Sequence, residues 1–128
     1  MNDDRYVVDA SALLAMLVGE PGGDAVASLL SLALVSTVNW SEVLQKARQH
    51  GADVAGLLED LESVGMELVP FGASEAAAAA DIWHRGNRSL ALADRACLAT
   101  AMIRRCTVVT ADRAWTRLDL GVDVEVIR

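Results

Sequence analysis

Four acidic residues stand where apolar segments of this chain begin or end, and they are its strongest chemical signal. Two directly follow β-rich runs and two open helix-like stretches; they are Asp9, Glu42, Asp94 and Asp112. Carboxylates gathered at strand ends repel one another, and a fold tolerates that cost mainly when a hard divalent cation neutralises them. Their types and positions therefore indicate a metal site.

The other residues of the chain favour oxygen ligands for this metal. His50 and His84 are isolated, and no Cys-x-x-Cys pair exists, so a zinc site is not expected. Oxygen-only ligation selects Mg²⁺ or Mn²⁺. Magnesium binds few carboxylates and keeps several waters, which suits metal-assisted hydrolysis of a phosphodiester.

Each acid also has a simpler interpretation as a helix or turn cap. Asp9 can cap a helix from Ser11, Asp94 lies in a first helical turn, and Asp112 can cap a turn before Trp115. Asn39-x-x-Glu42 resembles a capping box. The set as a whole is harder to explain by capping, because Asp9 follows a buried strand, where an unpaired carboxylate is costly.

The elements that must position these acids alternate along the chain. Expected strands are Arg5–Val8, Leu34–Val38, Glu67–Phe71, Thr107–Thr110 and Val124–Ile127. Expected helices are Ser11–Leu17, Gly23–Ala33, Trp40–His50, Asp53–Ser63, Ser74–His84 and Ala93–Arg104. This alternation predicts an α/β fold, a mainly parallel sheet of four or five strands with helices on both faces. We expect one domain, residues 1–128.

Ligands of parallel α/β sheets bind beyond the carboxyl ends of the strands, at a switch in strand order. Asp9 and Asp112 lie at or just past such ends, and Glu42 follows the second strand by a few residues. Asp94 comes from a helix start that must pack near the same edge. Four acids that are distant in sequence are thus expected to meet in one cleft.

Composition narrows the class of protein. Hydrophobic residues make up 53% of the chain, which leads us to expect that another subunit or partner covers some apolar surface. The N-terminus is not basic, and the longest uncharged run, residues 25–41, is short for a membrane span. We expect a soluble, cytoplasmic protein in which Cys97 and Cys106 are buried, reduced thiols.

The charge is distributed unevenly. The net charge is −7, but residues 85–117 contain seven arginines and two aspartates, a local charge of +5. The remaining residues have four basic and sixteen acidic side chains, or −12. Two interpretations of the basic segment stay open: a solvated helix face with a loop, or a rim that attracts phosphate beside two of the four acids.

Four segments together resemble the successive motifs of PIN-domain ribonucleases, in particular VapC toxins of bacterial toxin–antitoxin pairs. They are Val7–Leu13, Asn39–Val43, Leu92–Ala101 and Val109–Arg113. The resemblance covers essentially the whole chain, in the family's order and spacing. It implies a three-layer α/β/α PIN-like fold and a divalent-metal-dependent endoribonuclease that acts as a toxin.

The resemblance also implies roles for single residues. Asp9, Glu42, Asp94 and Asp112 would be the catalytic ligands of Mg²⁺ or Mn²⁺. Ser11 and Thr110 match polar positions that support such a site, and Asn39 would orient Glu42. The fourth acid is the family's least regular, and Asp119 is a conceivable substitute for Asp112.

The partners that the resemblance implies are an RNA substrate, often tRNA or ribosomal RNA, and a cognate VapB-like antitoxin that blocks the cleft. The family usually forms a homodimer, and it contacts DNA only indirectly, through the antitoxin. No contact with a membrane is implied.

Arginines and tryptophans offer further contacts with RNA. Arg95 and Arg113 each follow a candidate ligand, so each could bind RNA phosphate or form a salt bridge with a neighbouring acid. Trp40, Trp83 and Trp115 could stack on bases, but core or dimer-interface positions are the simpler interpretation.

Two other functions compete with a nuclease. A catalytically inactive PIN-like binding module has no need for all four acids. A Mg²⁺-dependent phospho-receiver needs an acidic pair and a strand-end lysine, whereas Lys46, the only lysine, is expected in mid-helix. A phosphatase of the two-aspartate type expects an aspartate where this chain has Ser11.

Overall fold

The computed structural model describes residues 4–128, and at its centre is a parallel sheet. The sheet has the order β3-β2-β1-β4-β5, and every neighbouring pair is parallel. This confirms the predicted α/β class and the mainly parallel sheet of four or five strands. The strands are β1 (Tyr6–Val8), β2 (Ala33–Ser36), β3 (Glu67–Val69), β4 (Thr107–Thr110) and β5 (Val124–Val126).

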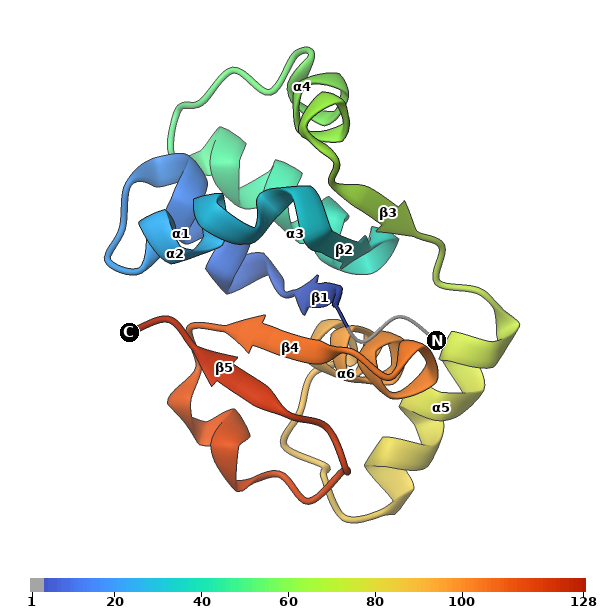
Figure 1. Cartoon of the computed structure of the whole chain (residues 1–128). Helices are drawn as coiled ribbons and strands as arrows, with labels where there is room; N and C mark the ends of the chain where they lie inside the picture. Colours follow the sequence, from blue (N-terminus) through green and yellow to red (C-terminus); the bar gives the residue numbers. More distant parts are fainter. Residues whose placement is uncertain (1–3) are drawn as a thin grey trace.

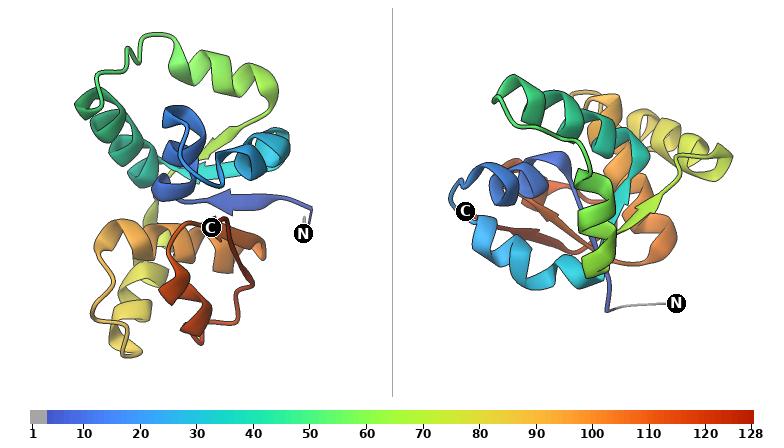
Figure 2. Two further views of the ribbon diagram at one scale, coloured as in Figure 1. Left: turned by 90° about the vertical axis from the view of Figure 1, so that its left-hand side faces the viewer. Right: turned by 90° about the horizontal axis from the view of Figure 1, so that it is seen from above.

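Helices cover both faces of the sheet, which gives three layers (Figure 1, Figure 2). Helices α1 to α4 lie on one face, and α5, α6 and the 3₁₀ turn η2 lie on the other. The helices are α1 (Ala10–Val18), α2 (Gly23–Leu29), α3 (Thr37–Gln49), α4 (Leu57–Val64), α5 (Ala73–His84) and α6 (Leu92–Arg104), with 3₁₀ turns η1 (Leu30–Leu32) and η2 (Arg113–Arg117).

The strands divide the core between the two faces by simple alternation. Val8 and Val35 pack among α1, α2 and α3, whereas Val7, Leu34 and Val108 pack against α5 and α6. All five are at most 2% exposed. Such continuous apolar strands are typical of a parallel sheet that is buried on both sides.

Helix α3 begins three residues earlier than its sequence suggests. The predicted strand Leu34–Val38 ends at Ser36, and the predicted helix from Trp40 begins at Thr37. The reason is a cap: the Ser36 hydroxyl accepts a hydrogen bond from the Val38 amide at 3.3 Å. The predicted capping box at Asn39 and Glu42 is therefore wrong, because Asn39 lies inside the helix and Ser36 is the N-cap.

Helix α4 starts later than predicted, and η2 was not predicted. The Asp53 side chain accepts from the Ala55 amide in a turn, and α4 begins only after Gly56, whose φ is +74°. The predicted helix Gly23–Ala33 ends at Leu29 and continues as η1. These shifts leave the layers unchanged.

Both cysteines are buried and neither forms a disulfide, as predicted. Among residues 4–128 no single helix is long and apolar enough to cross a membrane. The segments Ala10–Val18 and Gly23–Leu32 meet that criterion only as a pair, bent by 105° at the break.

Candidate active site

The strand order places a cleft beside β1 and β4. Strands β1 and β4 are neighbours in the sheet, but the elements that follow them lie on opposite faces. Helix α1 follows β1 on one face, and η2 follows β4 on the face that carries α6. A small pocket of about 110 Å³ lies there. All four predicted acids line it, together with Ser11 and Asn39: Asp9, Glu42, Asp94 and Asp112.

Asp9 lies at the floor of this cleft, where β1 becomes α1. It is 6% exposed and is the N-cap of α1, accepting from the Ala12 amide at 2.9 Å. Its two carboxylate oxygens also accept from Ser11 Oγ at 2.8 Å and Thr110 Oγ1 at 2.6 Å. Burial raises the pKa of Asp9 in spite of these three bonds, and the nearby Asp94 raises it further.

Thr110 joins the two strand ends. Its hydroxyl donates to Asp9 and accepts from the Asp112 amide at 3.0 Å, and the side chain is fully buried. The Ser11 hydroxyl accepts from the Ala111 amide at 3.0 Å while donating to Asp9. Both predicted supporting residues therefore contact the site, and they fix Asp9 against the end of β4.

Glu42 and Asn39 come from the first turns of α3. The Asn39 amide donates to Glu42 Oε1 at 3.2 Å and to the Ala93 carbonyl at 3.0 Å, so it links α3 to the start of α6. Asn39 is 1% exposed, and its Oδ1 has no hydrogen-bond partner among the described residues. Asn39 thus contacts Glu42 and lines the cleft, and its role in orienting Glu42 stays a prediction.

Asp94 enters from the first turn of α6. One of its oxygens accepts from the Ala91 amide at 3.2 Å, which is a cap of its own helix. Burial raises the pKa of Asp94; the Ala91 bond lowers it, and the charges of Glu42 and Asp112 raise it again. The carboxylates are therefore close enough to repel one another.

The fourth acid in the cleft is Asp112 and not Asp119, since only Asp112 lines the pocket. Asp112 caps η2 by accepting from the Ala114 amide at 2.9 Å. It lies beside Arg113, which is exposed at the start of η2.

Arg95 points away from the cleft. Its guanidinium donates to the Leu90 carbonyl at 3.2 Å and to the Ala79 carbonyl at 3.1 Å, so it braces α6 against α5. These bonds use two of its five N–H donors, and Arg95 does not line the cleft. No ion pair links Arg95 to an acid among the described residues.

Sequence reasoning missed two residues of the cleft, Lys46 and Trp115. Lys46 lies one helical turn after Glu42 on α3, and its charge lowers the pKa of Asp94. That i, i+4 spacing was the available signal. Trp115 is 1% exposed and held by η2, which the sequence did not reveal; its indole N–H has no partner among the described residues.

The donor set fits a hard cation. In residues 4–128 no three His, Cys, Asp or Glu side chains are already gathered closely enough to hold an ion. The available donors are nonetheless oxygens. Burial raises the pKa of Cys97 well above its usual value, and Asp9, Asp94 and Glu42 raise it further, so this thiol stays protonated. Repelling carboxylates and the unpartnered Asn39 oxygen suit Mg²⁺ or Mn²⁺.

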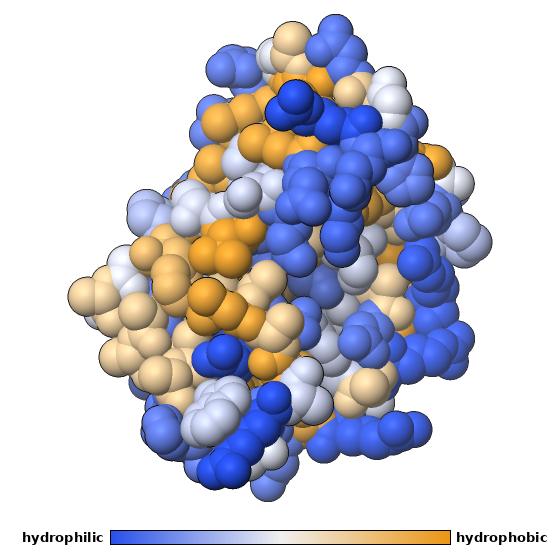
Figure 3. Space-filling model, turned by 180° about the vertical axis from the view of Figure 1, so that it is seen from behind, coloured by the Kyte–Doolittle hydropathy of each residue, from blue (hydrophilic) through white to orange (hydrophobic). Residues whose placement is uncertain are grey.

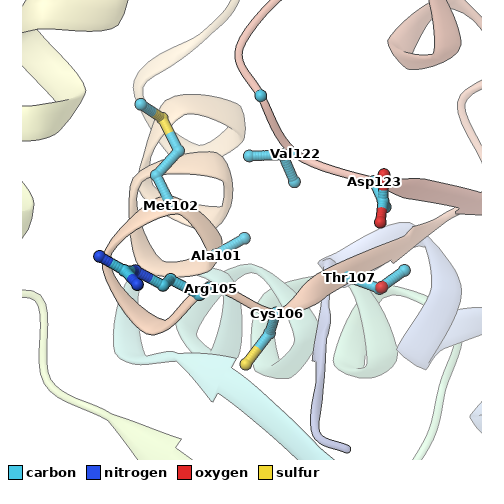
Figure 4. A pocket seen from close by; sticks show the side chains of 8 residues that line it. Ala101, Met102, Arg105, Cys106, Thr107, Val122 and Asp123 are labelled. Atoms are coloured by element: carbon cyan, nitrogen blue, oxygen red, sulfur yellow. The ribbon is translucent and has the colours of Figure 1, made fainter. Parts of the chain in front are cut away.

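A larger hollow, of about 490 Å³, lies at the opposite end of β4, between the end of α6 and residues 121–123 (Figure 4). Its two charged residues, Arg105 and Asp123, lie on opposite sides of it, and the Cys106 sulfur is directed away from Val122 (Figure 4). It holds no cluster of chemical groups comparable to the cleft.

Comparisons with known proteins agree with this geometry. The family model described as PIN domain matches residues 6–120. The structure is similar to a toxin–antitoxin complex from Klebsiella pneumoniae, with a TM-score of 0.77, 18% identity and coverage of 96% of this chain and 98% of that one. Comparison with curated proteins gives no significant match.

Two further solved structures share the fold. VapBC from Salmonella typhimurium, described as bound to DNA, has a TM-score of 0.72 at 16% identity over 97% of this chain and 98% of that one. VapBC-5 from Mycobacterium tuberculosis has a TM-score of 0.63 at 24% identity over 98% of both chains. At these identities the likeness shows the fold alone.

Proposed function

This chain belongs to the PIN-domain family, and from that premise we propose that it is a divalent-metal-dependent endoribonuclease. The observation that carries the proposal is the convergence of Asp9, Glu42, Asp94 and Asp112 on one small cleft. Four acids from α3, α6 and the ends of β1 and β4 have no reason to be gathered for capping alone, since a cap acts within its own segment.

Asp9, Glu42, Asp94 and Asp112 would hold the Mg²⁺ or Mn²⁺. When bound, the ion supplies an activated water and neutralises charge on the phosphate oxygens. The residues of the chain do the positioning: Ser11 and Thr110 hold Asp9 in a single orientation, and Asn39 holds Glu42. Lys46 offsets part of the negative charge that an RNA phosphate must approach.

We further propose that the chain is the toxin of a toxin–antitoxin pair and forms a homodimer. The fold it shares with toxin–antitoxin complexes supports a VapB-like antitoxin as its partner. An arginine of such a partner entering the acidic cleft would form charge-assisted hydrogen bonds there and displace the metal. Arg113, exposed beside Asp112, is our candidate for a contact with RNA phosphate.

Cleavage of RNA by the purified chain tests the activity. We expect cleavage with Mg²⁺ or Mn²⁺, none with EDTA, and a loss of about 100-fold or more in Asp9→Asn or Asp94→Asn. Asp119→Asn is the matched control, because this acid lies outside the cleft and should leave the rate unchanged.

Two results would contradict the proposal. Full activity of the purified Asp9→Asn and Asp94→Asn proteins would contradict the assignment of these two residues as metal ligands. RNA binding without any metal-dependent cleavage would instead favour an inactive PIN-like binding module. Mapping RNA ends after brief induction of the wild type, with Asp9→Asn as the reference, would identify the RNA that is cut.

A further inference from the structure

The structure separates the three tryptophans by their exposure, and it buries Trp40, which its place in an amphipathic helix had made the best candidate for an interface. Trp40 and Trp115 are 7% and 1% exposed and belong to the two cores, whereas Trp83 is 36% exposed in the last turn of α5. A large aromatic ring at the surface, where it stabilises no core, is a candidate for binding.

Positive charge surrounds this ring. The Arg88 guanidinium lies 4.6 Å from the Trp83 ring centroid, and the His84 ring meets it edge-on at 5.1 Å. The segment from Trp83 to Arg88 contains no acid, and Arg85 has only a long, exposed ion pair of 3.8 Å with Asp81. Arg88 has no ion pair within residues 4–128. Its charge is therefore free to attract a phosphate.

The loop that carries Arg88 is held in place. The Asn87 side chain donates to the Ile82 carbonyl at 3.2 Å, and the Leu90 amide donates to the Asn87 carbonyl at 3.3 Å. Arg95 ties the Leu90 carbonyl to α5. Arg88 and Trp83 are thus positioned before any ligand arrives, which lowers the entropic cost of binding.

The same loop leads directly to the cleft. Residues 85–91 run from the end of α5 to the start of α6 (Figure 1, Figure 2), where the Ala91 amide binds Asp94, one of the four acids. Seen from behind, apolar side chains gather over the α5 side, and strongly hydrophilic ones lie at the lower edge, where this loop runs (Figure 3). Trp83 is in the last turn of α5, so its ring lies next to the start of this loop.

We propose that Trp83 and Arg88 form a platform on which an unpaired base of the RNA stacks, on the α5–α6 side of the cleft. The neighbouring phosphates then meet Arg85 and Arg88. Single-stranded nucleic acid suits this site because a base supplies a π face and its backbone supplies negative charge. A purely apolar partner would leave the arginines unpaired. The inference rests on the proposed function, since it concerns the substrate of that same cleft.

Binding is best measured where no cleavage occurs, in the Asp9→Asn protein with EDTA, using a labelled single-stranded RNA. Trp83→Ala should weaken binding roughly tenfold, as expected for loss of one stacked base. Trp83→Phe should keep most of the affinity, and Arg88→Ala should lie between them. Ile103→Ala is the control, because Ile103 is 40% exposed at the far end of α6. Circular dichroism confirms that each variant is folded.

Two further readouts separate stacking from other roles. RNA should quench the fluorescence of exposed Trp83, and most of this quenching should disappear in Trp83→Phe, since Trp40 and Trp115 are buried and only Trp115 lines the cleft. Fully paired RNA should bind Trp83→Ala and the parent protein alike, because its bases are not available.

Three outcomes would overturn the platform. In the first, Trp83→Ala binds single-stranded RNA like its parent; metal-dependent cleavage by the wild type would then still support the proposed nuclease. In the second, the variant changes its oligomeric state but not its RNA affinity, which would make Trp83 a protein contact. In the third, neither the parent nor the wild type binds or cleaves RNA, which would remove the proposed function as well.

Discussion

At the scale of single residues, the cleft has a conflict between two uses of the same carboxylates. Asp9 and Asp112 each accept a hydrogen bond from the segment that follows them, and Asp94 accepts one from the Ala91 amide at the start of its own helix, as caps do. Burial is the main cause that raises the pKa of Asp9 and of Asp94, and the charges of neighbouring acids in the cleft raise both further. Capping fixes where each acid enters, and a cation would relieve the repulsion that remains.

Among the residues that support the cleft, Thr110 is the one whose substitution we expect to disturb the arrangement most. Thr110→Val keeps the shape but removes a hydroxyl that binds Asp9 at 2.6 Å and the Asp112 amide at 3.0 Å. Because both partners are then left unsatisfied next to a buried side chain, we expect a loss of about 1–3 kcal/mol in the free energy of unfolding. Metal affinity should fall about 10- to 100-fold.

Thr110→Ser is the control for this prediction, since it retains the hydroxyl. Denaturant unfolding measures the stability, and titration calorimetry with Mn²⁺ measures the affinity. Equal metal affinity in the Val and Ser variants would mean that Thr110 does not help to position the ligands.

At the scale of elements, local sequence determines most of the fold but not the boundaries that shape the site. Strand β4 is found at the residues expected, because the apolar pair Val108 and Val109 is bounded by a threonine on each side. The start of α3 was misplaced, because β-branched Thr37 and Val38 favour a strand locally while the Ser36 cap and packing against α1 and α6 make them helical.

The cleft was predictable only in part, for the same reason. Asp9, Asp94 and Asp112 could be found because each stands at or near an element end, and Glu42 because it follows the second strand by only a few residues. The bond from Asn39 to the Ala93 carbonyl joins residues 54 positions apart and depends on how α3 packs on α6. Trp115 likewise enters the cleft through η2, a turn without periodicity. Such contacts belong to tertiary packing and leave no local pattern.

Gly23 tests the packing of the first two helices. A Cβ at this position would lie 2.8 Å from the Ala15 carbonyl carbon and 2.9 Å from Met16 Cα, both main-chain atoms that cannot turn aside. Gly23→Ala should therefore cost about 3 kcal/mol of unfolding free energy by forcing α2 away from α1. Because Asp9 is the N-cap of α1, RNA cleavage should fall as well.

Gly19→Ala is the matched comparison, since nothing lies within 4 Å of its Cβ and only its φ of +75° opposes the change. It should cost about 1–2 kcal/mol. Chemical denaturation of both variants decides the point, and a Gly19 variant less stable than the Gly23 variant would refute the crowding argument.

At the scale of the whole molecule, positive charge is concentrated in one segment in spite of the net charge of −7. The basic segment, residues 85–117, begins at the α5–α6 loop and includes α6, β4 and η2, so it forms much of the layer opposite α1 to α4 (Figure 1). The acids of the cleft lie between these layers. This distribution suits the RNA substrate that we propose, because its backbone would meet arginines while one phosphate approached the carboxylates through a cation.

Binding of a cation should stabilise the whole fold. Because only the folded chain gathers the four acids, Mn²⁺ at about 100 times its Kd should add about 2.7 kcal/mol of unfolding free energy, or roughly 10 °C in Tm. Asp9→Asn and Asp94→Asn should lose this shift and Asp119→Asn should keep it. Thermal unfolding with and without Mn²⁺ measures the effect, and equal shifts in all four proteins would place the ion elsewhere.

Without metal, the same acids should make stability depend on pH in a defined direction. Burial raises the pKa of Asp9 and Asp94 above their usual value of 3.8, so the folded chain holds these protons more tightly than the unfolded chain. Their contribution to stability is thus complete below that usual value and is lost as the pH rises through the raised values.

The difference in unfolding free energy between the wild type and the double variant Asp9→Asn/Asp94→Asn isolates these two groups from all other acids. In EDTA, this difference should shift in favour of the wild type as the pH is lowered from neutral towards 4. With saturating Mn²⁺ the trend should reverse, because the cation binds the ionised carboxylates and competes with protons. A difference that stays constant with pH in EDTA would mean that neither acid is perturbed in the folded chain, and the case for electrostatic repulsion in the cleft would fail.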